Sequence, residues 1–153
     1  MKKILIGSFI LIGIVCLVIF AFWFDNRNMQ RVKIKVDYLV ENGEYSVGSV
    51  TGKTTQTIRG GGTMLTSVMY EYQTIDAKYT NAIGAVTAEA ISEKAHENYN
   101  FDINKGDKFL VVYDPTNPEN SLLMLDKPIE KEGDFERCVK EMEQMRKGNI
   151  TAN

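Results

Sequence analysis

Residues 109–118 read FLVVYDPTNP. The first five, Phe109 to Tyr113, are apolar at every position, so they lack the alternation of a strand with one solvated face. Such a run is typical of a short strand in the middle of a sheet, or of a strand between a sheet and a helix. We therefore predict a buried central strand here, with a rigid turn directly after it.

The turn that follows contains Asp114, Pro115, Asn117 and Pro118. Each proline fixes its own φ and biases the preceding residue toward extended backbone. Asp and Asn side chains hydrogen-bond nearby turn amides. A Ca²⁺ site would need several more converging oxygens than this segment supplies. We interpret the four residues as a structural turn.

The segments on either side of this core are rich in β-forming residues. Val, Thr, Ser and Tyr dominate residues 44–58 and 63–75, and a shorter run follows at 78–83. These runs predict three strands, with Gly48 and Gly52 as points of bulging or close approach. Residues 122–125 predict a last short strand.

Two segments have helical composition. Residues 85–98 predict a short surface helix, after which Tyr99, Phe101 and Ile103 alternate as an extended approach to the next turn. Residues 133–148 predict a C-terminal helix that Asp134 caps and Gly148 stops. Its apolar face contains Phe135, Cys138, Val139, Met142 and Met145.

The pattern as a whole predicts a mainly β domain, α+β at its edges, over residues 44–128. We expect an antiparallel sandwich or partly open barrel of about five or six strands, with the C-terminal helix lying across one face. The 153-residue length fits one such domain.

Residues 4–24 read ILIGSFILIGIVCLVIFAFWF and contain no charge. At about 1.5 Å per residue this helix would be about 31 Å long, which matches the hydrocarbon core of a bilayer. Bulky residues up to Phe24 disfavour a cleaved signal peptide. Val15 directly before Cys16 disfavours a lipoprotein. We expect an uncleaved single-pass signal anchor after a short tail at 1–3, followed by a juxtamembrane connector at 25–43 that fits a strand or a helix equally.

The charges flanking this segment bear on its orientation. Four basic residues follow the segment and outnumber the basic groups before it: Arg27, Arg31, Lys33 and Lys35. The positive-inside rule, taken literally, therefore favours a cytoplasmic domain. A two-lysine start before an apolar run is, however, how an exported chain begins, and long domains translocate largely regardless of charge. We favour the cytoplasmic (inner) membrane of a bacterium, with an extracytoplasmic domain.

The tyrosine-rich strand, the Gly-Asp turn and the V-x-Y-D-P-x-N-P segment together resemble a family of small bacterial membrane-anchored β domains of unknown function. The resemblance spans roughly residues 36–125, and residues 84–98 depart from it. It implies the β fold and the membrane anchor, and it implies no activity. The matching residues are Tyr70, Tyr72, Gly106, Asp107, Val111, Tyr113, Asp114, Pro115, Asn117, Pro118 and Ser121.

Motifs for chemistry are weak. Gly52-Lys53-Thr54 lacks the earlier glycine of a phosphate loop, because position 47 is Val. His96 is the single histidine, which excludes a two-histidine zinc motif. We therefore predict no catalytic residue, cofactor or metal. The loop Arg59, Gly60, Gly61 and Gly62 is a candidate interaction loop.

Two functions remain open. The first is a membrane-tethered, non-enzymatic binding module whose partner is another envelope protein or a second copy of the chain, such as an accessory subunit of an envelope complex. The second is a small membrane-linked hydrolase or transferase that uses Asp107, Tyr113 and Asp114. A net charge of −2 argues against nucleic acid as a partner.

Overall fold

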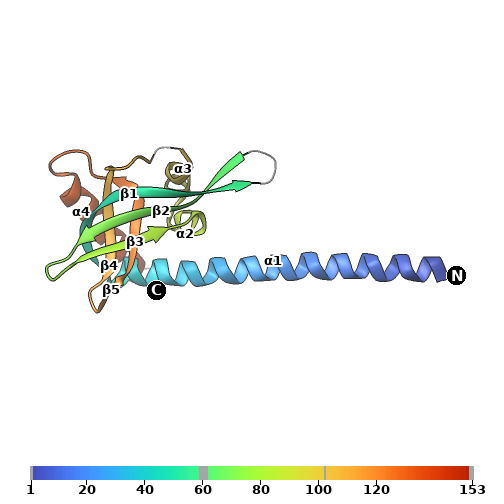
Figure 1. The fold of residues 1–153 in the computed structure, drawn as a ribbon. Coiled ribbons are helices and arrows are strands. Elements are labelled where there is room, and N and C mark those ends of the chain that lie inside the picture. Colours follow the sequence, from blue (N-terminus) through green and yellow to red (C-terminus); the bar gives the residue numbers. More distant parts are fainter. Residues whose placement is uncertain (1, 59–61, 102, 152–153) are drawn as a thin grey trace.

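The computed structural model describes residues 2–58, 62–101 and 103–151. Its elements follow the chain in an α–βββ–αα–ββ–α order (Figure 1). They are α1 (Lys2–Asn42), β1 (Glu44–Ile58), β2 (Gly62–Gln73), β3 (Lys78–Ile83), α2 (Ala85–Ile91), α3 (Glu93–Phe101), β4 (Lys108–Asp114), β5 (Asn117–Pro128) and α4 (Asp134–Thr151).

The described strands form one antiparallel sheet in the order β3-β2-β1-β4-β5. The sheet curls into a half-barrel, so that β4 and β5 run at a steep angle to β2 and β3 (Figure 1). The prediction of an antiparallel β domain with a C-terminal helix is confirmed, and the class is α+β. The sandwich alternative is wrong, because the described strands form a single curled sheet and helices cover its faces.

Strand β4 is buried on both faces, as its apolar run predicted. From Phe109 to Asp114 every residue is buried. Phe109, Val111 and Tyr113 face the inner core, whereas Leu110 and Val112 face an outer core. Burial on both faces explains why the segment shows no polar alternation.

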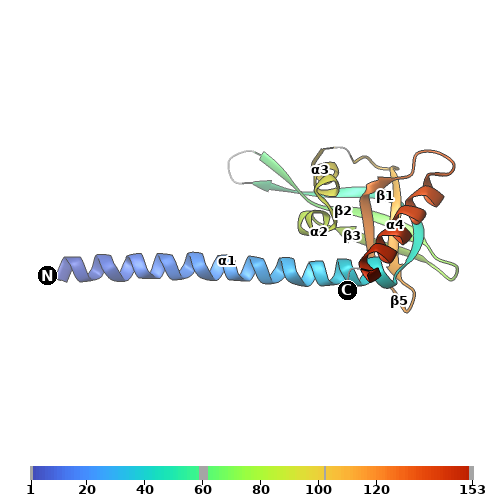
Figure 2. The ribbon, with the colours of Figure 1, turned by 180° about the vertical axis from the view of Figure 1, so that it is seen from behind.

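Helices form the layer on each side of this strand. The inner core joins the sheet to α2 and α3 through Ala88, Ala95 and Tyr99. On the outer face, α4 crosses β4 and β5 and meets the end of α1, as seen from behind in Figure 2. The outer core consists of Val36, Leu39, Leu110, Val112, Leu122, Met124, Cys138 and Met142.

Helix α1 is continuous over 41 residues and leaves the domain as a rod (Figure 1). The segment 25–43, which the sequence left open between strand and helix, is helical up to Asn42. Its packed stripe consists of Val32, Val36, Leu39 and Val40, because residues three and four apart share one face of a helix.

The expected membrane segment at 4–24 lies within α1. The side chains of residues 4–13, 18, 22 and 24 lie outside the described residues. Among the residues that are described, no helix contains a stretch long and apolar enough to cross a bilayer.

Several element boundaries differ from the predictions. The last strand, predicted at 122–125, is β5 over Asn117–Pro128. The helix predicted at 85–98 is two helices, because Ser92 is extended and its hydroxyl accepts the Ala95 N–H at 3.0 Å as a new N-cap. Helix α3 then continues to Phe101, where alternation suggested extended chain. Helix α4 runs through Gly148 to Thr151, since no change to left-handed backbone occurs at that glycine.

Gly48 is required by its surroundings, since a Cβ there would lie 2.4 Å from Val111 Cγ2 and 3.0 Å from Leu123 Cδ1. We expect Gly48→Ala to lower the free energy of unfolding by about 1–3 kcal/mol through overpacking. Denaturant unfolding of the full chain in detergent measures this loss. Gly148→Ala, which meets nothing within 4 Å, is the control and should not destabilise. Equal stability of both variants would contradict the packing argument.

Candidate functional site

Four tyrosines form a stacked cluster in the half-barrel, with Tyr72 at its centre. The ring of Tyr72 lies 6.2 Å from Tyr70, 5.7 Å from Tyr79 and 5.6 Å from Tyr113. Tyr70, Tyr72 and Tyr113 are buried. Their alternate positions in β2 and in β4 place them on the inner face, where aromatic pairs add to the burial energy.

The hydroxyl groups of this cluster bind the opposite edge of the sheet. Tyr70 Oη and Ser121 Oγ are hydrogen-bonded at 2.9 Å, and Tyr72 donates to the carbonyl of Pro118. Asn81 Nδ2 in edge strand β3 donates to Glu119 O at 2.8 Å and to Ser121 Oγ at 3.0 Å. Side chains therefore close the half-barrel where its two edge strands, β3 and β5, do not pair.

Burial keeps these phenols protonated. It raises the pKa of Tyr70 and of Tyr72 above the ordinary value, although Ser121 opposes the shift by hydrogen bonding. Burial and the Glu44 carboxylate, which accepts from Tyr113 Oη at 2.9 Å, raise the pKa of Tyr113 to about 12. At neutral pH the phenols of Tyr70, Tyr72 and Tyr113 are therefore neutral hydrogen-bonding groups.

The Asp114 carboxylate binds the turn between β4 and β5, and Asn117 and Pro118 of the predicted turn are the first two residues of β5. Asp114 Oδ1 accepts from the Thr116 N–H at 2.8 Å and from Thr116 Oγ1 at 2.6 Å. Its Oδ2 accepts from Tyr38 Oη of α1 at 3.3 Å. The Thr116 bonds come first among the causes that lower the pKa of Asp114. The carboxylate thus joins the turn to the end of α1.

The residues of the enzymatic alternative do not converge. Asp107 precedes the first residue of β4 and Asp114 is its last, so about 23 Å of extended chain separates them. Asp107 Oδ2 accepts the Asn104 N–H at 2.6 Å within the turn that Gly106 forms with a φ of +96°. Each carboxylate stabilises its own turn.

A groove of about 900 Å³ lies beside Asp107. We call it the 94–132 groove. Its lining mixes three lysines with three carboxylates, so it has no single sign of charge, and Phe109 and Pro128 supply apolar surface. The lining residues are Lys94, Asn98, Gly106, Asp107, Lys108, Phe109, Pro128, Ile129, Glu130, Lys131 and Glu132.

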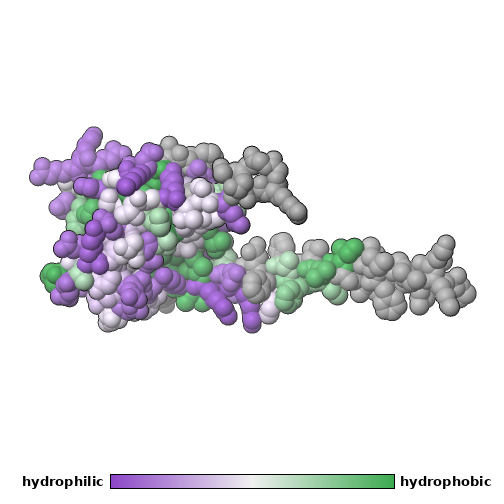
Figure 3. All heavy atoms as spheres, in the orientation of Figure 1, coloured by the Kyte–Doolittle hydropathy of each residue, from purple (hydrophilic) through white to green (hydrophobic). Residues whose placement is uncertain are grey.

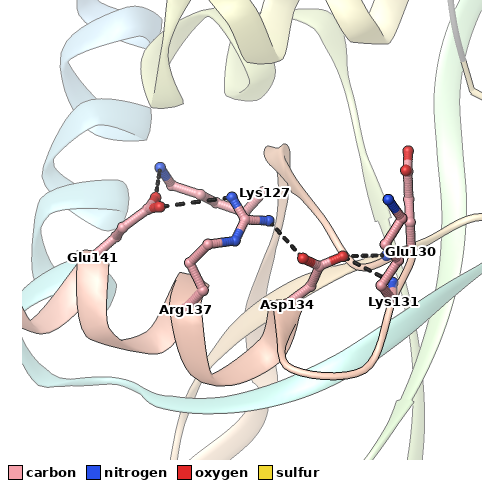
Figure 4. A network of polar contacts seen from close by, with 6 residues as sticks. All are labelled: Lys127, Glu130, Lys131, Asp134, Arg137 and Glu141. Carbon is pink, nitrogen blue, oxygen red and sulfur yellow. Dashed lines mark hydrogen bonds and ion pairs between the residues drawn. The ribbon is translucent and has the colours of Figure 1, made fainter.

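The 129–133 wall of this groove is held by α4 (Figure 4). Asp134 Oδ2 accepts the N–H of Lys131 at 2.8 Å and of Glu130 at 3.0 Å, while Oδ1 pairs with Arg137 at 2.9 Å. Asp134 was predicted to cap the amides of α4; instead it binds the loop before that helix. This preorganises the wall.

The end of β5, directly before the wall, is held by contacts with α4 and α3. Lys127 Nζ pairs with Glu141 Oε2 at 2.8 Å, and Asn98 Nδ2 binds the Leu125 carbonyl at 2.6 Å. Leu125 and Lys127 lie in a bulge of β5, because Phe109 pairs with Pro128 whereas its neighbour Leu110 pairs with Met124. No sequence signal marked the bulge or the groove.

The remaining sequence candidates are the 59–62 loop, His96 and Cys138. The loop residues Arg59, Gly60 and Gly61 lie outside the described residues, and Gly62 begins β2. His96 Nδ1 is buried without a hydrogen-bond partner in the structure. Cys138 is buried in the outer core, and burial raises the pKa of its thiol. In the described part of the chain no three metal-binding side chains gather.

Comparison with known proteins returned no matching family, no matching curated protein and no matching solved structure. The resemblance to the membrane-anchored β domains therefore stays a prediction.

The lowered pKa of Asp114 makes a pH prediction. Its stabilisation is present above the ordinary pKa of 3.8 and is lost as pH falls through the lower folded value. We expect acid to lower the thermal midpoint of the natural chain more steeply than that of Asp114→Asn. Asp76→Asn, in the exposed β2–β3 turn, is the matched control and should follow the natural chain. If the thermal midpoints of the natural chain and of Asp114→Asn fell in parallel as the pH is lowered, Asp114 would not be a source of this pH dependence.

Proposed function

We propose that the chain is a single-pass, membrane-tethered and non-enzymatic interaction module, acting as an accessory subunit of an envelope complex in a bacterial inner membrane. The observation that carries this proposal is that one unbroken helix, α1, contains the apolar segment 4–24 and ends within the outer core of the domain. The proposed anchor would thereby be joined to the domain by one continuous helix.

The exposure of the outer half of α1 supports the anchor. Leu17, Phe20 and Trp23 are 70%, 62% and 51% exposed, and in Figure 3 the coloured stretch of the rod just beyond the domain is mostly green. Contiguous apolar surface of this kind marks a site of contact with membrane or protein. The Arg27 guanidinium lies 4.2 Å from the Trp23 ring centroid, a pair suited to a membrane–water interface.

The packing of α1 supports a fixed position for the domain. Only residues 25–31 separate the apolar segment from Val32, the first residue packed on the outer core. At 1.5 Å per residue, Phe24 and Val32 are about 12 Å apart along the axis. The domain would stand about two turns of helix above the bilayer and could not swing freely.

The 94–132 groove is the surface that we assign to the partner. Its wall is preorganised by Asp134, and its interleaved lysines and carboxylates suit a polar polypeptide segment with both signs of charge. The neutral tyrosines and the separated carboxylates support binding over catalysis.

Cross-linking in cells followed by mass spectrometry tests this proposal. The natural chain is expected to recover one reproducible envelope partner or a second copy. Charge reversal of Lys94 and Lys108 to Glu should reduce recovery at least ten-fold, since like charges oppose the partner's cations. Lys140→Glu, on the exposed face of α4, is the matched control. Recovery of no partner, or equal loss in the control, would contradict the assignment.

The side of the membrane is tested by fusing alkaline phosphatase behind Asn153. We expect an active enzyme, because we propose an extracytoplasmic domain and this phosphatase is active only after export. A fusion of a cytoplasmic reporter at the same position should be inactive. An expressed but inactive phosphatase would place the domain in the cytoplasm.

A further inference from the structure

The outer half of the β1–β2 hairpin extends beyond the rest of the sheet. Strand β4 pairs with β1 only from Glu44 to Ser49, and β3 pairs with β2 only from Val68 to Gln73. The pairing of β1 with β2 continues to Ile58 and Gly62. Residues 52–58 and 62–67 therefore form a two-stranded ribbon, which we call the ribbon, with no strand paired to either outer edge among those described.

A two-stranded ribbon without neighbouring strands has little stability of its own. Two strands alone are marginally stable in water, and unpaired edges invite aggregation. The described side chains pack little: Lys53, Thr54, Thr55 and Gln56 are exposed, and Met64 is 52% exposed. A contact outside the domain would stabilise such a projection.

The direction of the ribbon indicates what it contacts. In Figures 1 and 2 the ribbon and the amino-terminal part of α1 leave the domain in the same direction. From Gly52 to Ile58 the ribbon is about 20 Å long at 3.3 Å per residue. The stretch of α1 from Val32 to Phe24 is about 12 Å long. The ribbon is thus long enough to reach the plane where the apolar segment of α1 ends.

Charge favours anionic headgroups at that plane. Between Glu44 and Glu71 the charged residues are two, Lys53 and Arg59, both basic. The adjoining stretch of α1 from 25 to 35 has one acidic and four basic residues. The chain as a whole has a net charge of −2, whereas these two segments have an excess of positive charge. A partner strand would satisfy the ribbon edges but would not explain this polarity.

We propose that the ribbon binds the anionic lipid headgroups of the bilayer in which α1 is anchored, with Lys53 facing the headgroups and Met64 entering their apolar boundary. This contact rests on the proposed membrane anchor. It gives the domain a second point of attachment, and it stabilises the ribbon through the bilayer instead of through a third strand. Basic residues near an anionic membrane and partly inserted apolar groups both favour such binding.

Tryptophan quenching separates the two attachments, because Trp23 is the one tryptophan of the chain. The full chain is reconstituted in vesicles of phosphatidylcholine alone or with phosphatidylglycerol, each containing lipids brominated at shallow acyl positions. Quenching of natural Trp23 reports the anchor. In the Trp23→Phe background, Met64→Trp reports the ribbon, and Ile75→Trp, fully exposed in the β2–β3 turn, reports a site that should stay in water.

We expect Trp23 to be quenched in both vesicles, Met64→Trp only with phosphatidylglycerol, and Ile75→Trp in neither. Adding Lys53→Gln should lower the ratio of bound to free ribbon about five-fold. Lys140→Gln is the matched charge control and should leave this ratio unchanged. Thermal melting of each variant establishes that the domain is folded.

The other outcomes are distinguishable. In one outcome Trp23 is quenched, but Met64→Trp is no more quenched than Ile75→Trp. This result would overturn the ribbon contact and leave the anchor standing. Equal quenching of Met64→Trp in phosphatidylcholine alone would overturn the selection of anionic lipid. Unquenched Trp23 would overturn the anchor and the ribbon contact together.

Discussion

The packing of α1 and α4 on the outer face of β4 and β5 is the contact on which the architecture depends. Leu39 of α1 and Met142 of α4 are fully buried there, against Leu110 and Leu122. Because β4 is apolar on both faces, it requires such a cover in addition to the inner core. Arg146 of α4 connects the two helices at this junction. Its Nε donates to Val40 O at 2.6 Å, and its guanidinium also donates to the Gly43 carbonyl. The same guanidinium lies 5.0 Å from the Tyr45 ring centroid. An arginine from one end of the chain thus satisfies carbonyls that the helix at the other end leaves open.

Strand positions were largely predictable because local chemistry sets them. The strands at 44–58 and 78–83 begin and end where the β-branched runs do, and the apolar residues 109–113 indicated burial on both sides. Segment 25–43 was ambiguous because Val32, Val36 and Val40 fit both the two-residue period of a strand and the three-to-four-residue period of a helix. Only the outer core, which neighbours in sequence do not reveal, selects the helix.

The site was less predictable, since it depends on contacts distant in sequence. The turn at Asp114 could be foreseen from its own residues. The bonds from Asn81 to β5, and from Asp134 to the 129–133 loop, join segments whose proximity follows from the curl of the sheet and the return of α4. Ser92 could have been found as an N-cap, because a serine inside a predicted helix favours capping over continuation.

The unbroken course of α1 has a mechanical consequence. A helix without a hinge transmits tilt, so in an anchored chain the inclination of the apolar segment would set the inclination of the whole sheet. Membrane helices tilt by about 20° on average, and the tilt changes with the thickness of the surrounding hydrocarbon. A thicker or thinner bilayer would then bring one side of the domain nearer the lipid and lift the other. Lipid composition would in this way change the tilt of the domain relative to the bilayer, because the hydrogen-bonded backbone of α1 connects the two.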